Sequence, residues 1–346
     1  MKNFKISVFG YDLLGDSGND GIRYAWKYND GNQLVESAAF PQHSKNSKDN
    51  ICGYTTSVSS GCILKALKHP CSFCRTGNLL SYIDSLTAID IAKQNIFMVM
   101  ADMYCSKHNE LYDFPREFAY MGQGEPGYSY PQVREAIRIT DLAMKMLGQK
   151  VYRHIISTSG VPEMVFAFKD DLKNGFFKER VTIHFSLHAG SQREIIMPIE
   201  MKYPFVDVLD SMSEIVDLSG EKPCVGILLF KDYKPNNKGI TYSNELSQIK
   251  EILKYINPNK FRLSFCEYNA SNDIGKAGIY SEKIALSILD YAQKAGFEAK
   301  LFSSFGKKEM SACGMLGSKK PEYYVGEKWI NIERETNELI SKIYTI

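Results

Sequence analysis

The sequence lacks the features of secreted, membrane-spanning and strongly basic proteins. Its 42 Lys and Arg residues nearly balance its 40 Asp and Glu residues, so the net charge is only +2. That total gives no global signal for binding a polyanion, although a local basic groove is compatible with it. No run approaches the roughly 18 apolar residues of a membrane span, and the amino terminus has no apolar signal-peptide core. Eight unevenly spaced cysteines do not form a secreted disulfide framework. We therefore expect a cytoplasmic protein with reduced thiols and no membrane association.

A dinucleotide-binding glycine fingerprint, internal repeats and low-complexity segments are also absent, and the remaining pattern alternates between strand and helix. Strands are predicted at residues 117–121, 151–156, 181–187, 224–230, 261–266 and 299–303. Helices are predicted at residues 86–96 after Ser85 as N-cap, 133–147, 162–172, 205–216, 246–256, 284–295 and 308–315. This order favours parallel strands joined by right-handed crossovers. We predict an α/β fold, a partial (β/α)6 barrel of the TIM type.

A strand–turn–strand pattern at residues 22–40 predicts a β-hairpin before the barrel. The expected division of the chain is an N-terminal hairpin extension at residues 1–50, a core at residues 51–320 and a C-terminal tail at residues 321–346.

Residues 61–77 concentrate three cysteines, Cys62, Cys71 and Cys74, the last two as a C-x-x-C pair with an aromatic residue inside it. Cubane iron–sulfur clusters are built on thiolates, and three thiolates leave one iron open for a substrate or cofactor. A zinc site instead completes its tetrahedron with a fourth Cys or His, and His69 would supply that ligand. This stretch alone leaves both a cluster and a zinc site open.

Polar and glycine residues follow the predicted strands, at the ends where a parallel barrel carries its chemistry. Residues 122–126 read Gly-Gln-Gly-Glu-Pro, in which glycines allow close approach of a ligand and the carboxylate suits a cationic amine. Residues 157–160 read Ser-Thr-Ser-Gly, which suits a carboxylate or ribose. The plainer alternatives are a glycine turn with a solvated Glu and a helix cap.

Three later strand ends continue the series. Residues 186–189 read Ser-Leu-His-Ala, Asn269 follows the strand at 261–266, and Cys313 lies between Ala312 and Gly314. A structural His and a buried, inert Cys are the plainer interpretations of two of these residues. Taken singly each motif is weak, but their order along the chain is specific.

In that order the motifs resemble those of the radical S-adenosylmethionine (SAM) family, and within it the RlmN and Cfr adenosine methylases, which methylate an aromatic carbon of adenosine in RNA. The likeness spans roughly residues 22–317. It implies a barrel of the radical SAM type in which Cys62, Cys71 and Cys74 ligate a [4Fe–4S] cluster whose open iron chelates SAM. It also implies an electron donor such as flavodoxin or ferredoxin.

The resemblance assigns further roles residue by residue. The family motifs Gly-Met-Gly-Glu-Pro, Ser-Thr-Ser-Gly and Ser-Leu-His-Ala, with the Asn of its sixth strand, imply SAM contacts at Gly124, Glu125, Ser157, Ser186, Leu187, His188 and Asn269. Its Ala-Cys-Gly motif makes Cys313 the thiol that accepts a methyl group from one SAM and delivers it as a methylene with the help of a second. Its hairpin motif makes Glu36 the proton-accepting carboxylate; the alternative for Glu36 is a solvated hairpin residue.

The chain departs from the family pattern in three places. The cluster spacing is C-x8-C-x2-C where the family has C-x3-C-x2-C, and the added residues include Lys65, Lys68 and His69. Enzymes of the family have a second thiol that resolves a covalent crosslink between the protein and its substrate. The position of that Cys falls on Thr55 here, and we take the nearby Cys52 as its counterpart. Only about 20 residues precede the hairpin, where the ribosomal RNA enzymes carry an RNA-binding accessory domain.

The interpretation we adopt is a monomeric, cytoplasmic radical SAM methyltransferase acting on an adenine carbon of ribosomal or transfer RNA, with SAM and a [4Fe–4S] cluster as cofactors. One alternative is a paralogue that acts on a non-ribosomal RNA, a peptide or a small molecule. The other is a zinc-stabilised binding module that uses Cys62, Cys71, Cys74 and His69.

Overall fold

The computed structural model describes residues 4–7, 22–28, 33–40, 51–104, 114–190, 192–235, 239–271, 274–302, 316–317 and 327–345. Within these ranges ten strands form one sheet in the order β1 (Phe4–Ser7), β2 (Ile22–Tyr28), β3 (Leu34–Phe40), β4 (Cys52–Thr55), β7 (Arg116–Tyr120), β8 (Val151–Thr158), β9 (Val181–Ser186), β10 (Cys224–Leu229), β12 (Arg262–Glu267) and β14 (Ala299–Phe302). Two small ladders lie outside it and pair β5 (Ser59–Ser60) with β6 (Asp84–Ser85), and β11 (Lys234–Pro235) with β13 (Gly275–Lys276).

The sheet is antiparallel from β1 to β4 and parallel from β4 to β14. The predicted α/β class and the N-terminal hairpin, which is β2 and β3, are therefore confirmed. The parallel part has one more strand than the six predicted, because it begins with β4. The hairpin continues the main sheet through the β3–β4 pairing, and the domain boundary at residue 50 stays a prediction.

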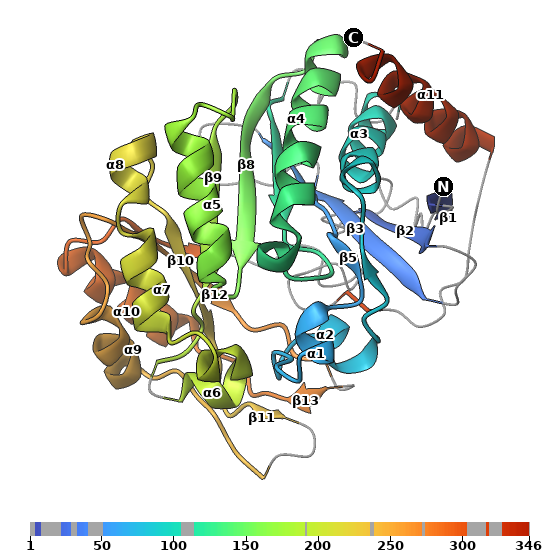
Figure 1. Cartoon of the computed structure of the whole chain (residues 1–346). Helices are drawn as coiled ribbons and strands as arrows, with labels where there is room; N and C mark the ends of the chain where they lie inside the picture. Colours follow the sequence, from blue (N-terminus) through green and yellow to red (C-terminus); the bar gives the residue numbers. More distant parts are fainter. Residues whose placement is uncertain are drawn as a thin grey trace.

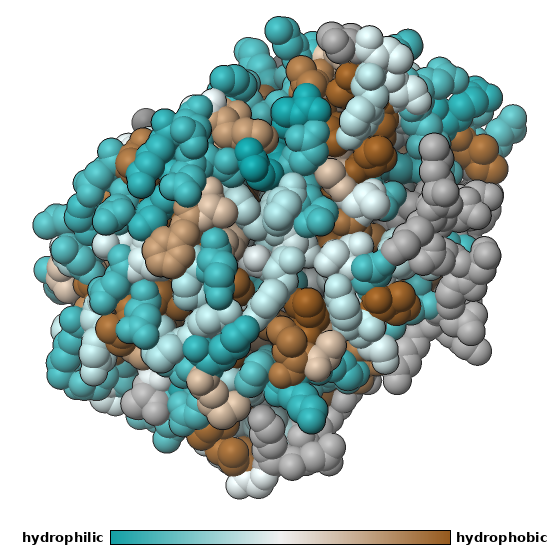
Figure 2. Space-filling model, in the orientation of Figure 1, coloured by the Kyte–Doolittle hydropathy of each residue, from teal (hydrophilic) through white to brown (hydrophobic). Residues whose placement is uncertain are grey.

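Helices connect the parallel strands and cover one face of the sheet (Figure 1). The longer ones are α3 (Ala88–Tyr104), α4 (Tyr130–Met146), α5 (Pro162–Lys173), α7 (Phe205–Met212), α9 (Leu246–Leu253), α10 (Glu282–Lys294) and α11 (Glu327–Ile343). The short ones are α1 (Ile63–Ala66), α2 (Arg75–Leu79), α6 (Arg193–Ile196), α8 (Ile215–Ser219) and the 3-10 turns η2 (Pro126–Ser129) and η3 (Pro198–Met201). On the molecular face in Figure 2, apolar residues form scattered small patches in a mostly hydrophilic surface.

Alternation along the strands separates a helix-covered face from what we call the inner face. Phe118, Ile183 and Phe265 are fully buried on the helix-covered side. The residues that alternate with these along each strand point to the opposite face. The register of adjacent strands places these residues side by side. The inner face thus carries Glu36, Thr55, Glu117, Arg153, Ser157, Thr182, His184, Ser186, Arg262, Ser264 and Cys266.

Two of the predicted helices differ from the structure in their cap or their continuity. Helix α3 begins at Ala88, and Thr87 rather than Ser85 caps it: the Thr87 hydroxyl accepts a hydrogen bond from the backbone N–H of Asp90 (3.2 Å), whose carboxylate accepts one back from the Thr87 N–H. Ser85 belongs to β6. The single helix predicted at 205–216 is two helices, α7 and α8. The helix predicted at 308–315 lies outside the described residues.

Helix α11 occupies much of the predicted C-terminal tail. It packs against α3, where Glu333 pairs with Lys93 at 2.7 Å and the Thr336 hydroxyl lies 3.4 Å from the sulfur of Met100. The segment is therefore part of the folded body, on the helix-covered side near β2 and β3 (Figure 1). Within the described ranges no helix combines the length and apolar character needed to cross a membrane.

Candidate SAM and iron–sulfur site

The three loop cysteines lie beyond the carboxyl end of β4, where Cys62 precedes α1 and Cys74 precedes α2. Burial raises the pKa of all three thiols, and the charge of Cys74 raises the pKa of both Cys62 and Cys71 further. The sulfurs are thus close enough to disfavour one another as thiolates, a cost that a bound cationic cluster removes. Among the described residues they do not form a ready-made three-ligand metal group. The donor set suits an iron–sulfur cluster, whose binding would draw the thiols together.

The aromatic residue inside the C-x-x-C pair, Phe73, anchors this loop to the sheet. Its ring packs edge-on against His188, with centroids 5.1 Å apart, and against Phe230 and Tyr268 at 5.6 and 6.3 Å. These three partners follow β9, β10 and β12. One buried ring therefore fixes the cysteine loop over three strand ends.

Asn78, in α2, holds the backbone of the same loop. Its side-chain amide donates to the carbonyls of Cys71, Ser72 and Cys74 at 2.9, 3.2 and 2.7 Å. The Tyr233 hydroxyl donates to the Ser72 carbonyl from the other side at 2.9 Å. Neither residue was among the predicted site residues, because no spacing rule marks a side chain that binds only backbone.

Glu125 is buried and all its acceptor positions are used within the protein. One carboxylate oxygen accepts from the Thr158 hydroxyl (2.6 Å) and the Gly127 N–H (2.9 Å), and the other accepts from the N–H and hydroxyl of Ser159 (2.8 and 2.7 Å). The predicted alternative of a solvated Glu is therefore wrong. The carboxylate ties the β7 and β8 strand ends together, which leaves the backbone of this turn for a ligand.

Gly124 has a left-handed φ of 107° and approaches the chain just before the cysteine loop. A Cβ there would lie 2.2 Å from the Ser59 hydroxyl and 2.7 Å from a methyl of Val58. The Ser59 hydroxyl in turn donates to the carbonyl of Gly61, next to Cys62. Only glycine fits where the β7 loop meets the start of the cysteine loop.

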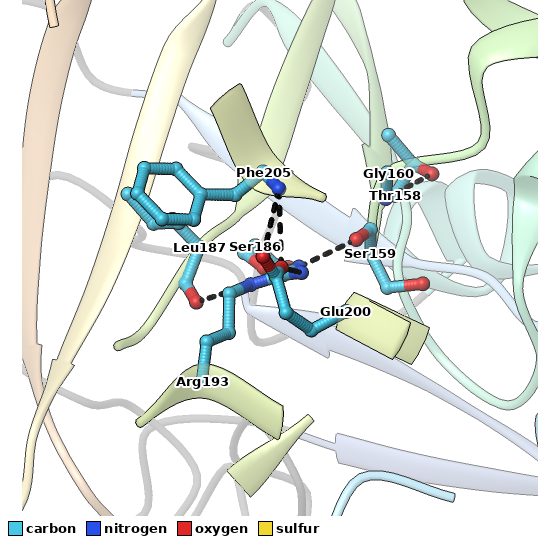
Figure 3. Close-up of polar contacts among 8 residues, drawn as sticks. All are labelled: Thr158, Ser159, Gly160, Ser186, Leu187, Arg193, Glu200 and Phe205. Carbon is cyan, nitrogen blue, oxygen red and sulfur yellow. Dashed lines mark hydrogen bonds and ion pairs between the residues drawn. The ribbon is translucent and has the colours of Figure 1, made fainter. Parts of the chain in front are cut away.

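Arg193 is fully buried beneath the ends of β8 and β9 (Figure 3). Its guanidinium donates to the carbonyls of Ser159 (2.7 Å), Ser186 (3.2 Å) and Leu187 (3.0 Å) and pairs with Glu200 at 2.5 Å. Desolvation lowers the pKa of Arg193, and the charge of Glu200 counteracts that effect. One planar fork thus fixes the backbone of two predicted SAM motifs.

His188 holds its place in a left-handed conformation, φ 61°, directly after β9. Its Nδ1 accepts from the Leu228 N–H at 3.3 Å, and the Asn244 side-chain amide donates to its carbonyl at 2.9 Å. Burial and the charge of Arg193 lower the pKa of His188 to about 3, so the imidazole is neutral at physiological pH. The ring acts as a buried support against β10 and Phe73.

The other predicted SAM contacts gather at the same edge. Ser157 and Ser186 are half-buried on the inner face near the ends of β8 and β9, Leu187 is buried, and Asn269 is buried two residues after β12. All seven predicted contact residues therefore lie along the carboxyl ends of neighbouring parallel strands, as the motif order predicts.

Glu36 lies on the inner face of β3 and is fully buried, so its interpretation as a solvated hairpin residue is wrong. Its carboxylate accepts from the backbone N–H of Gly317 (2.6 Å) and the side-chain amide of Gln123 (3.3 Å), and Arg23 lies 3.4 Å away. The hairpin carboxylate thus contacts both the β7 loop and a segment 281 residues further along the chain.

Leu316 and Gly317 lie between Glu36 and the cysteine loop. The Thr76 hydroxyl donates to the Leu316 carbonyl at 2.8 Å, and a Cβ on Gly317 would lie 3.2 Å from the Thr76 nitrogen. Gly317 has a φ of 139°, which glycine adopts without strain. Cys313 itself lies outside the described residues.

Cys52 is placed away from this site. It is the first residue of β4, at the amino end of the parallel strands, and it shares the helix-covered face with Tyr54, whose hydroxyl donates to Asp102 of α3 (2.6 Å). Burial raises the pKa of Cys52 to about 12, against the charge of Arg116. Cys52 lies at the amino end of its strand, points to the helix-covered face and has a raised pKa. These three features argue against Cys52 as a thiol that acts at the carboxyl ends of the strands.

Comparisons with known proteins cover the whole sequence and the fold. No family model matches the chain. The chain is 26% identical over 325 residues to the "Probable dual-specificity RNA methyltransferase RlmN" of Flavobacterium johnsoniae, covering 93% of this chain and 82% of that protein. It is 25% identical over 301 residues to the protein of the same description from Pseudothermotoga lettingae, covering 85% and 75%.

A solved structure supports the fold. The crystal structure of a radical SAM methyltransferase from Sphaerobacter thermophilus superposes with a TM-score of 0.69 at 18% identity, covering 92% of this chain and 82% of that one. Sequence, fold and the order of motifs at the strand ends therefore agree. The chain is similar to RlmN-like radical SAM methyltransferases, at about 25% identity over about 90% of its length.

Proposed function

We propose that the protein methylates a carbon of adenosine in RNA, using Cys313 as methyl carrier and two SAM molecules per turnover. The observation that carries the proposal is the position of Leu316 and Gly317, which join the cysteine loop through Thr76 to the Glu36 carboxylate. Cys313 precedes Leu316 by three residues in the sequence. The RNA substrate follows the description of the relatives.

Family membership implies an iron–sulfur cluster and SAM, and we propose Cys62, Cys71 and Cys74 as the ligands of a [4Fe–4S] cluster. When bound, the cluster supplies the electron that cleaves SAM reductively to a 5′-deoxyadenosyl radical. The raised pKa values of the three thiols mean that they hold their protons in the metal-free protein. Binding the metal therefore releases protons, and its affinity falls as pH falls.

The strand-end residues would hold SAM between the cysteine loop and the inner face. Because internal hydrogen bonds occupy the Glu125 carboxylate, the backbone at Gly124 and Glu125 is the part of this turn that can meet the amine. Ser157 and Ser186 offer hydroxyls on the inner face, and Asn269 offers an amide. Arg193 and His188 act beneath this layer by holding its backbone in place.

Glu36 is the proposed proton acceptor at the substrate carbon. A general base must lie within hydrogen-bond reach of its proton, and Glu36 lies on the inner face beside the segment that leads back to Cys313. Hydrogen bonds from Gly317 and Gln123 and the nearby Arg23 hold the carboxylate in position.

Mass spectrometry of anaerobically reconstituted protein tests the proposal. We expect Cys313 to carry a methyl group after incubation with SAM and reductant, and an RNA substrate to gain a methyl group on an adenine carbon. Cys313→Ala should abolish RNA methylation without changing iron content. RNA methylation by Cys313→Ala at the wild-type rate would exclude the methyl-carrier mechanism.

A further inference from the structure

A row of cationic side chains crosses the inner face, from the level of the proposed SAM contacts Ser157 and Ser186 toward the amino ends of the strands. His184 of β9 precedes Ser186 by two residues, so it lies about 7 Å nearer the amino end of the strand. Strand register places Cys224 of β10 beside His184 and Arg262 of β12 beside Cys224. Lys300 of β14 lies beside Ser264, one inner-face position further along.

Electrostatic coupling joins these residues into one group. Arg262, Arg153 and Lys300 all act on His184 and on the Cys224 thiol. We call Arg153, His184, Arg262 and Lys300 the basic row. Glu117 is the carboxylate that acts on His184 with them, and it is already paired with Arg153 at 2.5 Å. Three cations therefore face one carboxylate, which leaves Arg262 and Lys300 in excess.

Arg262 is the least satisfied member. It is 8% exposed, and its Nε and Nη2 have no hydrogen-bond acceptor in the part of the chain that the structure describes. The Thr182 hydroxyl, on the inner face of β9 and 2% exposed, also lacks a partner there. Leaving such donors unpaired inside a protein is costly, most of all for a charged group.

The same excess of positive charge disfavours protonation of His184. Burial, then Arg262 and Arg153, lower its pKa to about 3. The imidazole is therefore neutral and offers one N–H donor. His184, Arg153 and Ser264 are half-buried and Lys300 is exposed, so the row is partly open to solvent.

Structural packing alone does not account for the row. Barrel interiors are filled mainly by branched apolar side chains, and apolar residues of similar volume would avoid the cost of the unpaired charge. A tetrahedral oxyanion matches what is present, because it accepts hydrogen bonds on all sides and neutralises charge.

We infer that the basic row is an anion-binding site for a phosphate-class oxyanion, held by Arg262 and Lys300 with donors from Thr182 and His184. The anion would be either free phosphate or a phosphate group of the nucleotide that enters beneath SAM. The second source rests on the proposed function, whereas binding of the anion itself does not.

The test uses the full-length, reconstituted protein with inorganic phosphate as the probe. Phosphate is titrated against chloride at constant ionic strength, and binding heat and the unfolding midpoint are recorded. We expect phosphate to raise the midpoint of the wild-type protein and Arg262→Met to lose that shift. In phosphate-free buffer Arg262→Met should unfold at a higher temperature than the wild type, because it removes an unpaired buried charge.

Two further variants keep the test decisive. Lys300→Gln should weaken phosphate binding, and the matched control Lys294→Gln, an exposed lysine of α10, should bind phosphate like the wild type. The inference is overturned if wild-type protein shows no phosphate-dependent shift, or if Arg262→Met keeps it.

Comparing ligands separates the two sources. If the anion is a nucleotide phosphate, AMP should bind more tightly than either phosphate or adenosine, and Arg262→Met should reduce AMP to the level of adenosine. If it is free phosphate, AMP should bind no better than phosphate. If a Cys313→Ala variant binds phosphate but methylates nothing, the anion site exists independently of the methylation mechanism. If the wild-type protein methylates RNA but binds no phosphate, the anion site is rejected and the proposed function is not.

Discussion

The Phe73 ring stands at 82° to the imidazole of His188, with the ring centres 5.1 Å apart. This contact joins the C-x-x-C pair to the Ser-Leu-His-Ala motif, two segments that the sequence separates by more than 110 residues. It means that the cysteine loop and the strand ends proposed to bind SAM are positioned by the same buried cluster of rings.

Replacing Phe73 by Ala should therefore loosen the cluster ligands. Truncation of a buried Phe costs about 3–5 kcal/mol, and here the loss falls on the loop that carries Cys71 and Cys74. We expect a lower unfolding midpoint and fewer irons per chain after anaerobic reconstitution, measured by iron and sulfide assay. Phe166→Ala, which removes a ring that is 53% exposed, is the matched control and should reconstitute normally. Full iron content in Phe73→Ala would contradict the anchoring role.

Glu36→Gln tests the proposed base while keeping the size of the side chain. Losing a positioned general base typically costs about 100-fold or more in rate, so product methylation should fall by at least that factor. Methylation of Cys313 precedes the proton abstraction and should persist, as read by mass spectrometry. Glu282→Gln, an exposed carboxylate at the start of α10, is the control. A loss of Cys313 methylation together with product would instead assign Glu36 a structural role.

Cys52→Ser should leave product methylation within about twofold of wild type, because Cys52 lies on the helix-covered face at the wrong end of β4. Among the described thiols, Cys266 lies on the inner face near the carboxyl end of β12. We expect Cys266→Ser to trap a covalent protein–RNA adduct if this thiol resolves the crosslink. Denaturing gels of anaerobic reactions compare the two variants, and an adduct in Cys52→Ser alone would reverse the assignment.

Asp102 predicts a pH dependence of stability. Burial raises its pKa to about 6, although Tyr54 and Arg116 act in the opposite direction. Unfolded Asp ionises near pH 4, so between about pH 4 and 6 the folded protein holds a proton that the unfolded chain has lost. The contribution of Asp102 to the free energy of unfolding should fall by about 3 kcal/mol over that range and stay level above it.

Urea unfolding at several pH values measures this effect. The difference between wild type and Asp102→Asn should change between pH 4 and 6 and be constant from 7 to 8. The exposed Asp290→Asn should show no such change. Parallel curves for wild type and Asp102→Asn would mean that Asp102 titrates normally.

The location of the strand-end motifs could be predicted because successive parallel strands lie side by side in this fold. Motifs that follow one another along the chain therefore lie next to one another at one edge of the sheet. Ser157, Ser186 and Asn269 are each unremarkable alone, yet alternate strand and helix patterns place them along one edge. Strand β4 escaped prediction because four residues with a central glycine carry little periodicity. Helix α11 had a visible signal, with Trp329, Ile332, Thr336, Ile340 and Ile343 at helical spacing.

Other features depend on contacts that no local pattern encodes. Asn78 binds three carbonyls of the cysteine loop, and Arg193 binds three carbonyls from two strand ends, so neither has a sequence partner to mark it. The assignment of Cys52 as the counterpart of the family's second thiol failed for a related reason. Cys52 stands three residues before the aligned position, Thr55, and residues an odd number apart on a strand point to opposite faces of the sheet.

Among the residues that the structure describes, strands β1 and β14 lie at opposite edges of the sheet and do not pair with each other. A closed barrel admits only what passes through its mouth, whereas a trough with separate walls admits a long polymer lying across it. The width of the trough therefore sets no upper limit on the size of the substrate molecule. If the proposed function holds, only the nucleotide being modified has to fit between Glu36 and Arg262.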